Sequence, residues 1–224
     1  MHVDAILADA TRTEPEVDLV ADDGIAHSLW VVRDSARIGQ ITAAFDAMEA
    51  LYIADGHHRS AAASRVAASR SGDTRAGYFL CVIFPHAQMQ ILDYNRVVRD
   101  LAGMSPETLL ARISERFQVL PEAVAVNPDR PGTFGMYLAG QWYRLVIQPS
   151  RVPNDPVGRL DVSLLADNLL APLLGIEDPR RDRRIDFVGG IRGLVELEKR
   201  VDSGEMSVAF SLYPTRMEDL MAVA

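Results

Sequence analysis

The chain has 224 residues, which suits one domain or two small lobes and is enough for a sizeable hydrophobic core. Its net charge of −8 argues against non-specific binding to the phosphate backbone of nucleic acids, because nucleic-acid-binding domains are usually basic. The single cysteine, Cys81, excludes an internal disulfide bond and argues against zinc sites built from cysteine pairs.

The N-terminal part of the chain predicts one strand followed by one helix. Residues 28–34 have the pattern of a strand, and a turn-forming Asp-Asp-Gly precedes them. Residues 35–48 are expected to form a helix, with Ser35 as a plausible N-cap. The apolar side chains of this segment recur at helical spacing, at Ile38, Ile41, Phe45 and Met48.

A second strand, a turn and a second helix are expected next. Residues 51–54 have the pattern of a short strand that Asp55-Gly56 would end, and nothing breaks a helix from His57 to about Arg70. Residues 76–85 are a continuous apolar run with β-branched and aromatic side chains. Its length and content predict a strand that is buried on both faces.

The middle of the chain predicts a strand, a helix and a hairpin. Residues 89–98 have a strand pattern with a polar break at 93–96. The helix over residues 105–117 has a clear start, because Ser105 can act as its N-cap and a proline follows at the first helical position. Residues 132–148 alternate in the manner of a β-hairpin about Ala139-Gly140.

The C-terminal part predicts helices and strands in alternation. An amphipathic helix is expected from Asp161, which is most simply its N-cap, and Pro172 would end or kink it. The remaining elements are a strand over 184–190, a helix over 191–204, a strand over 206–214 and a helix over 215–224.

These elements predict an α+β fold with mixed sheets and flanking helices, because strands and helices do not alternate strictly and hairpins occur. We expect a single domain over residues 1–224, with two possible lobes, 1–150 and 151–224, joined near a proline-rich segment at 149–156. The last residues form an apolar helical pattern without a stop signal, so we expect a chain that is cut short.

The segment Asp55–Ser60, which reads DGHHRS, contains the most concentrated chemistry in the chain. The first N–H groups of a helix lack internal partners and lie at the positive end of its dipole, so they accept an anion such as phosphate. Gly56 allows a close approach, and Arg59 can bind phosphate oxygens with two donors. The alternative is a well-capped surface helix in which Asp55 is the cap and Arg59 forms a salt bridge.

The two adjacent histidines do not form a metal clamp. Consecutive side chains on a helix diverge by roughly 100°, whereas a two-histidine clamp needs a spacing of three or four. One histidine can act as an acid, a base or a phosphate donor, and Asp55 can be a cap, a histidine partner, a metal ligand or a base. We assign no residue to a metal site.

Three further residues are candidates for binding a substrate. His27 precedes Trp30, and a packed histidine is the plainer interpretation of it. Asn95 and Arg96 lie at the polar break of a strand pattern, where ordinary turn chemistry is an equally good explanation.

Several segments together resemble the bacterial and archaeal domain-of-unknown-function family 1015, over most of the chain from about Asp22 to Ala224. Their order and spacing make the resemblance more specific than the DGHHR turn alone. They are LYIADGHHR, HSLW upstream of it, and DYNRVVRDL, LDVSLLADNLLAPLLGI and VAFSLYPTRMEDLMAVA downstream. Members of this family are usually longer at both ends, and many have an aromatic residue where this chain has Ser60.

The DGHHR turn is also similar to the phosphate-binding turn of the ParB/sulfiredoxin superfamily, some members of which resemble free-serine kinases. Family 1015 is commonly associated with serine-biosynthesis genes. The resemblance implies ATP or ADP as a cofactor, with Mg²⁺ bridging the phosphates, and places Asp55 and His57 near the transferred phosphoryl group. It implies that the nucleotide phosphates are lined by Gly56, His58, Arg59 and Ser60.

The leading hypothesis is therefore a cytoplasmic, nucleotide-dependent phosphotransferase that acts on a small hydroxyl substrate such as serine. The alternatives are a nucleotide-binding regulatory protein without turnover and a metal-dependent hydrolase that uses Asp55 and a histidine. We expect a small-molecule substrate and a nucleotide as partners, with a homodimer possible. No membrane association is expected, because no stretch approaches the roughly 18 apolar residues of a membrane span.

Overall fold

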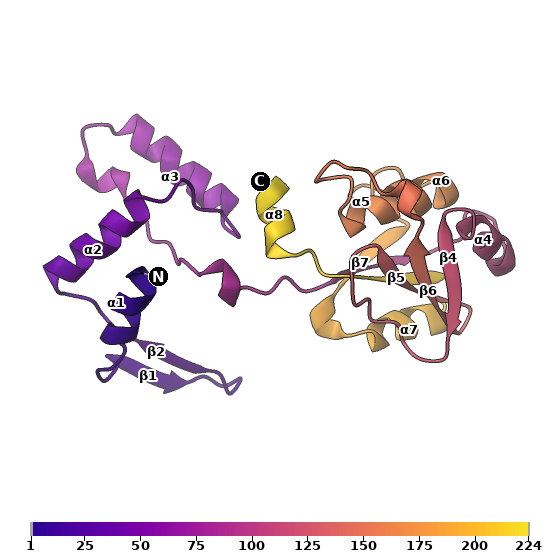
Figure 1. The fold of residues 1–224 in the computed structure, drawn as a ribbon, viewed down its shortest axis with the longest axis horizontal. Helices are drawn as coiled ribbons and strands as arrows, with labels where there is room; N and C mark the ends of the chain where they lie inside the picture. Colours follow the sequence, from indigo (N-terminus) through magenta and orange to yellow (C-terminus); the bar gives the residue numbers. More distant parts are fainter. Residues whose placement is uncertain (1, 224) are drawn as a thin grey trace. The chain divides into compact units, whose positions relative to one another are not determined.

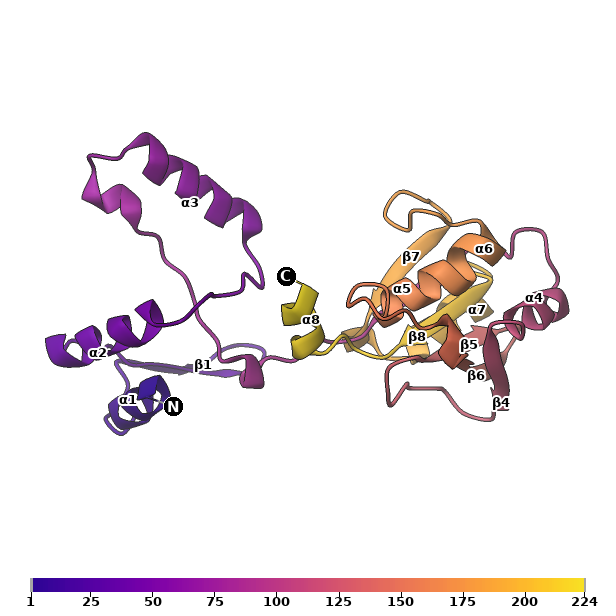
Figure 2. The ribbon, with the colours of Figure 1, turned by 45° about the horizontal axis from the view of Figure 1, so that its top comes forward.

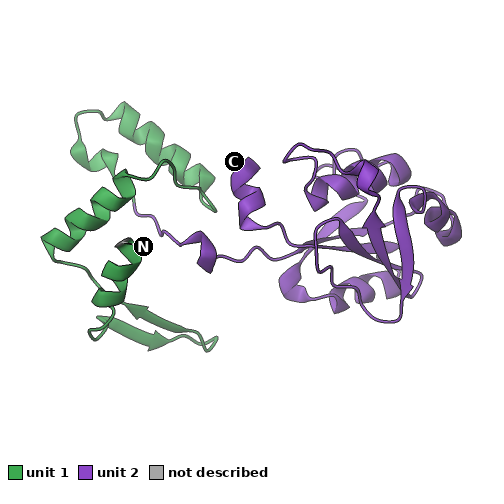
Figure 3. Cartoon of the chain, viewed as in Figure 1, with its two compact units in different colours: residues 1–79 green, residues 80–224 purple. Residues whose placement is uncertain are grey.

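The computed structural model describes residues 2–223. The chain divides into two compact units, residues 1–79 and residues 80–224 (Figure 3). We describe each unit by itself. No helix in the described residues is both long enough and apolar enough to cross a membrane.

The first unit consists of three helices and a small two-stranded antiparallel sheet in its described residues (Figure 1). Val17 pairs with Leu29 and Val20 pairs with Ala26. Ile6 is the one hydrophobic residue of 3–79 that is buried. The elements are α1 (His2–Ala10), β1 (Val17–Val20), β2 (Ala26–Leu29), α2 (Ser35–Asp46) and α3 (His57–Ser69).

Both predicted helices of this unit are confirmed, with one correction at a cap. The N-cap of α2 is Asp34 rather than Ser35: its backbone is extended, and its carboxylate accepts a hydrogen bond from the N–H of Arg37 at 2.8 Å. Aspartate is as good an N-cap as serine, so the cap moves by one residue without loss. The strand predicted over 28–34 ends at Leu29.

Two predicted strands of the N-terminal half are wrong. Residues 51–54 and 76–85 are not strands, and no strand of the described residues pairs with them. The apolar run is also exposed rather than buried, with Tyr78 at 84% and Leu80 at 94% of their full accessibility. Strand propensity reflects packing against neighbours, so a strand-like composition does not make a strand where no neighbour is present.

The second unit is built on a six-stranded sheet in the order β4-β6-β5-β8-β3-β7, in which every pair is antiparallel. The strands are β3 (Tyr94–Val98), β4 (Phe117–Glu122), β5 (Thr133–Leu138), β6 (Gln141–Ile147), β7 (Ile185–Gly189) and β8 (Val208–Leu212). The helices are α4 (Pro106–Ile113), α5 (Asp161–Leu165), α6 (Ala171–Leu174), α7 (Val195–Asp202) and α8 (Met217–Val223).

The α+β class is confirmed, but the sheets of the described residues are antiparallel rather than mixed. The division of the chain also differs from the expected one near 149–156. Strand β8 lies between β5 and β3, so a single sheet combines residues from both sides of that segment. The two units instead meet in sequence between Phe79 and Leu80.

Helices cover both faces of this sheet (Figures 1 and 2). On one face, α4, α5 and α6 pack on a large cluster that includes Phe117, Phe134 and Phe210, all buried. On the other face, α7 contributes Leu197 to a smaller cluster with Trp142. The hydrophobic core of the described residues therefore lies almost wholly in the second unit.

The local signals of α4 and of the hairpin are confirmed. Ser105 Oγ accepts a hydrogen bond from the N–H of Thr108 at 3.2 Å, and a proline occupies the first turn. The hairpin turns at Ala139 and Gly140, which have φ angles of 51° and 80° as a tight primed turn requires. The helix ends at Ile113, earlier than expected, and β4 follows.

Asp161 is not the N-cap of its helix, as the sequence suggested. Leu160 holds the cap position, and Asp161 is the first helical residue. Its carboxylate instead accepts a hydrogen bond from the N–H of Gly132, the residue just before β5, at 2.7 Å. The helix continues through a π-helical segment and α6 to Gly175, so Pro172 does not end it.

The polar break expected at 93–96 is also wrong, because β3 begins at Tyr94 and runs through it. Asn95 is fully buried in the middle of the sheet, and its side-chain oxygen accepts a hydrogen bond from the N–H of Leu212 at 3.0 Å. A buried amide that is hydrogen-bonded to a neighbouring strand is compatible with a central strand.

Candidate functional site

The DGHHR turn places an open helix N-terminus at the surface of the first unit. Gly56 is the N-cap of α3 and no side chain caps the helix there. The N–H of Ser60 donates to the carbonyl of Gly56 at 2.9 Å, which is the first bond of the helix. The three preceding N–H groups, those of His57, His58 and Arg59, therefore lack an intrahelical acceptor.

The conformation of Gly56 explains why glycine occupies this position. Its φ angle is +87° and its ψ angle is 25°, in the left-handed region that other residues rarely adopt. A Cβ at this position would also lie 3.4 Å from the guanidinium of Arg59. The turn thus brings its backbone and the Arg59 guanidinium close together.

Asp55 and Arg59 form an ion pair across this turn. Their nearest atoms, Asp55 Oδ2 and Arg59 Nη2, are 3.5 Å apart, and the two side chains are 93% and 81% exposed. Exposed pairs of this kind contribute little to stability. Arg59 can therefore leave Asp55 for a ligand anion at small cost.

The histidines and the serine of the motif complete the turn. His57 and His58 are exposed at the first two positions of α3, and Ser60 is half-buried. Both histidines lie in the helix, so the expectation that their side chains diverge applies to them. The described residues contain no group of three or more His, Cys, Asp or Glu side chains placed to hold a metal ion.

The three predicted substrate-binding residues lie on other elements. His27 is exposed on β2, opposite Leu19. Asn95 and Arg96 are on β3 of the second unit. Asn95 donates to Asp93 Oδ2 at 2.5 Å in addition to accepting from Leu212, so both ends of its amide are engaged within the second unit.

Arg96 is held differently from a surface arginine. Its guanidinium lies 5.2 Å from the ring centroid of Tyr94 and 4.9 Å from that of Phe187, and these two rings are stacked on each other. It also donates a hydrogen bond to the carbonyl of Tyr94. Burial lowers the pKa of Arg96 to about 10, which leaves it fully charged at neutral pH.

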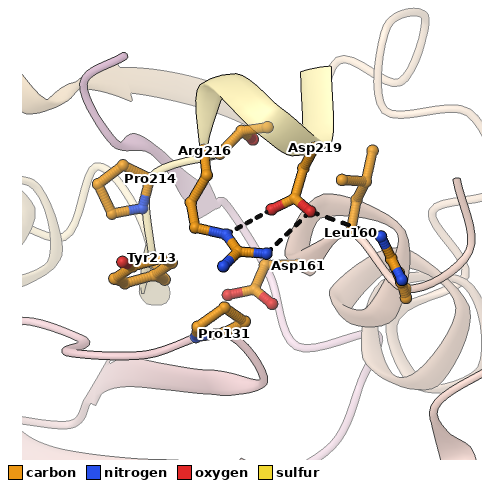
Figure 4. Close-up of a pocket in the computed structure, with 9 residues that line it drawn as sticks. Pro131, Leu160, Asp161, Tyr213, Pro214, Arg216 and Asp219 are labelled. Carbon is orange, nitrogen blue, oxygen red and sulfur yellow. Dashed lines mark hydrogen bonds and ion pairs between the residues drawn. The ribbon is translucent and has the colours of Figure 1, made fainter. Parts of the chain in front are cut away.

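One further polar site, a cavity in the second unit beside Asp161, could not be recognised in the sequence (Figure 4). Asp161 lies at the start of α5, whereas Tyr213, Arg216 and Asp219 follow β8, some fifty residues later in the sequence. Only the return of β8 to the middle of the sheet brings them together. The sequence indicated only one role for Asp161, that of an ordinary helix cap, and did not indicate that it is buried.

Comparison with known proteins gives one match. The model of a family described as "Protein of unknown function (DUF1015)" matches residues 2–163, which is more than half of the chain and includes the DGHHR turn. No match was found among curated proteins or among solved structures.

Proposed function

The chain belongs to the family of proteins of unknown function DUF1015, and we propose that it is a nucleotide-dependent phosphotransferase whose DGHHR turn holds the nucleotide phosphates. One observation carries this proposal: the N-terminus of α3 is free of any side-chain cap and exposes its first N–H groups beside Arg59.

The turn has the parts that phosphate recognition needs. The N–H groups of His57, His58 and Arg59 point out of the helix end, where the dipole favours negative charge. The Arg59 guanidinium adds charged donors, and Gly56 carries no Cβ beside that guanidinium. ATP and ADP are the ligands that this chemistry and the resemblance favour, and a bound Mg²⁺ would neutralise charge on the phosphates.

Asp55 and His57 are the candidates for the reacting end of the site. When Arg59 turns to a phosphate, Asp55 loses its partner and becomes an acceptor for the proton of a substrate hydroxyl. His57, at the first helical position, can donate a hydrogen bond to a phosphoryl oxygen. A small hydroxyl compound such as free serine is the proposed substrate, and the serine-kinase resemblance of the turn supports it.

Calorimetric titration of ATP and ADP with Mg²⁺ into the protein tests the phosphate grip. We expect binding by the wild type and at least about tenfold weaker binding by Arg59→Ala, because a charge-assisted bond is lost. Arg70→Ala is the matched control, since Arg70 is exposed at the opposite end of the same helix. Absence of heat with every nucleotide would rule out the proposal.

The same phosphate-binding turn would also suit a regulatory protein that binds a nucleotide without turning it over. Incubation with ATP or ADP, Mg²⁺ and a panel of hydroxyl-bearing amino acids, followed by mass spectrometry for phosphorylated products, separates the two functions. We expect a phosphorylated product with the wild type and none with Asp55→Asn. Nucleotide binding without any product would establish the regulatory alternative.

A further inference from the structure

The cavity beside Asp161 has a volume of about 200 Å³, smaller than the roughly 300–1,000 Å³ of sites for drug-sized ligands. Its charged lining is balanced, with Arg159 and Arg216 against Asp161 and Asp219. Pro131, Leu160 and Pro214 form apolar walls (Figure 4). A small occupant that carries both charges would match this lining, whereas a simple anion or cation would oppose half of it.

Asp161 is the unsatisfied group of this cavity. It is only 8% exposed, and while one of its oxygens accepts from Gly132, the other, Oδ2, is buried and makes no hydrogen bond within the described residues. A buried carboxyl oxygen without a partner costs free energy. Figure 4 shows this carboxyl on the side of the cavity that faces Arg216 and Pro131.

No basic side chain of the described residues forms an ion pair with Asp161, although Arg159 and Arg216 line the same cavity. The pKa of Asp161 is raised to about 6, mainly by burial and also by the negative charge of Asp219, while the nearby backbone N–H groups of Gly132 and Tyr213 act in the opposite direction. With a pKa of about 6 the group is mostly ionised at neutral pH, and an ammonium group is the partner that would stabilise this unpaired carboxylate.

The two arginines on the other side retain donors. Arg216 uses Nε and Nη2 to bind both oxygens of Asp219, at 2.8 and 3.0 Å. Arg159 reaches the same carboxylate only with Nη2, at 3.7 Å. Asp219 therefore orients the two guanidiniums and leaves Arg216 Nη1 and most of Arg159 for a carboxylate of a ligand.

We propose that this cavity binds a small zwitterion of the free α-amino acid type, with its ammonium at Asp161 and its carboxylate at Arg216 and Arg159. The site lies wholly in the second unit and does not depend on the function proposed for the DGHHR turn. The prolines and Leu160 contact the side chain of the ligand and limit its size.

Isothermal titration of the whole protein with each standard amino acid at neutral pH tests this inference. We expect one or a few small amino acids to bind. For the tightest of them, the amine that lacks the carboxylate and the acid that lacks the amine should each bind at least about tenfold more weakly, because each loses one charged contact. Absence of binding by every amino acid, or equal binding of either half, would overturn the proposal.

Two variants with matched controls locate the site. Asp161→Asn and Arg216→Gln should each weaken binding at least about tenfold. Asp167→Asn, on the same run of helix but exposed, and Arg180→Gln, at an exposed loop, should leave it unchanged. Unchanged affinity in a folded Asp161→Asn protein would contradict the assignment, and Arg216→Lys provides a second test if the glutamine variant does not fold. Nucleotide titration of the same variants is expected to be normal, which separates this site from the DGHHR turn.

Discussion

Burial of a carboxylate at Asp161 has a consequence for stability as well as for binding. The pKa of this group in the folded chain is about 6, above its ordinary value of 3.8, because it is removed from water and lies near Asp219. The folded protein therefore holds this proton more tightly than the unfolded chain does. The stability that results is present below about pH 4 and is lost as the pH rises through 6.

Replacing Asp161 by asparagine should remove this dependence on pH. The difference between the pKa values of 3.8 and about 6 corresponds to roughly 3 kcal/mol at most. We therefore expect the free energy of unfolding of the variant to exceed that of the wild type by up to this amount above pH 7. Asparagine keeps an oxygen that can accept from Gly132. Denaturant unfolding between pH 4 and 8, without ligand, compares the two proteins. If the free energy of unfolding depended on pH equally in the variant and the wild type, the assigned pKa would be contradicted.

Gly56 and Gly39 provide a matched pair of glycines in the first unit. Gly56 has a φ angle of +87°, so Gly56→Ala should destabilise the start of α3 by about 1–2 kcal/mol. Gly39 lies inside α2 with no atom near a Cβ, so Gly39→Ala should stabilise that helix by about 0.5–1 kcal/mol. Hydrogen exchange of the two helices measures both effects. Changes in helix stability of the same sign in both variants would contradict this prediction.

At the level of elements, the sequence predicted best where the signal was local. The start of α4 and the hairpin at Ala139-Gly140 were predicted correctly, because a cap and a tight turn depend on a few adjacent residues. Residues 76–85 were mistaken for a buried strand, because whether a strand forms depends on a partner that the sequence does not identify. Strand β3 was misjudged for the converse reason: the buried amide of Asn95 is satisfied by β8, more than a hundred residues away in sequence.

The contact between β5 and β8 is tight at Gly135. A Cβ there would lie 2.2 Å from Ser211 Oγ and 2.7 Å from the carbonyl of Val126, which accepts the Ser211 hydrogen bond. We expect Gly135→Ala to cost about 1–3 kcal/mol through overpacking. Gly189→Ala in β7 is the control, because no atom lies near its Cβ. Denaturant unfolding followed by the fluorescence of buried Trp142 reports both, and a tolerated Gly135→Ala would show that the sheet can relax there.

At the level of the whole molecule, the two units differ in how much apolar surface each buries. The helices α2 and α3 have no buried residues, whereas β5 and β8 are buried throughout. Local stability follows burial. We therefore expect the amides of α2 and α3 to exchange faster than those of β5 and β8 by on the order of a hundredfold or more. Hydrogen exchange by mass spectrometry measures this, and equal protection in α3 and β8 would contradict it.

The two candidate sites, like the elements, differ in how far they can be recognised from adjacent residues in the sequence. The DGHHR turn could be recognised in the sequence because all of its residues are consecutive and its chemistry follows from one helix start. The cavity beside Asp161 could not, because its second half arrives with β8. Because the residues of the turn are consecutive, a single substitution can test the role of each of them.

The most direct test of the central claim is the response of the α3 backbone amides to a nucleotide. In a ¹⁵N-labelled sample titrated with ADP and Mg²⁺, we expect the largest chemical-shift changes at His57, His58, Arg59 and Ser60, and their loss in Arg59→Ala. Unchanged amides at these positions at saturating nucleotide, or changes confined to other parts of the chain, would contradict the assignment of the DGHHR turn as a phosphate site.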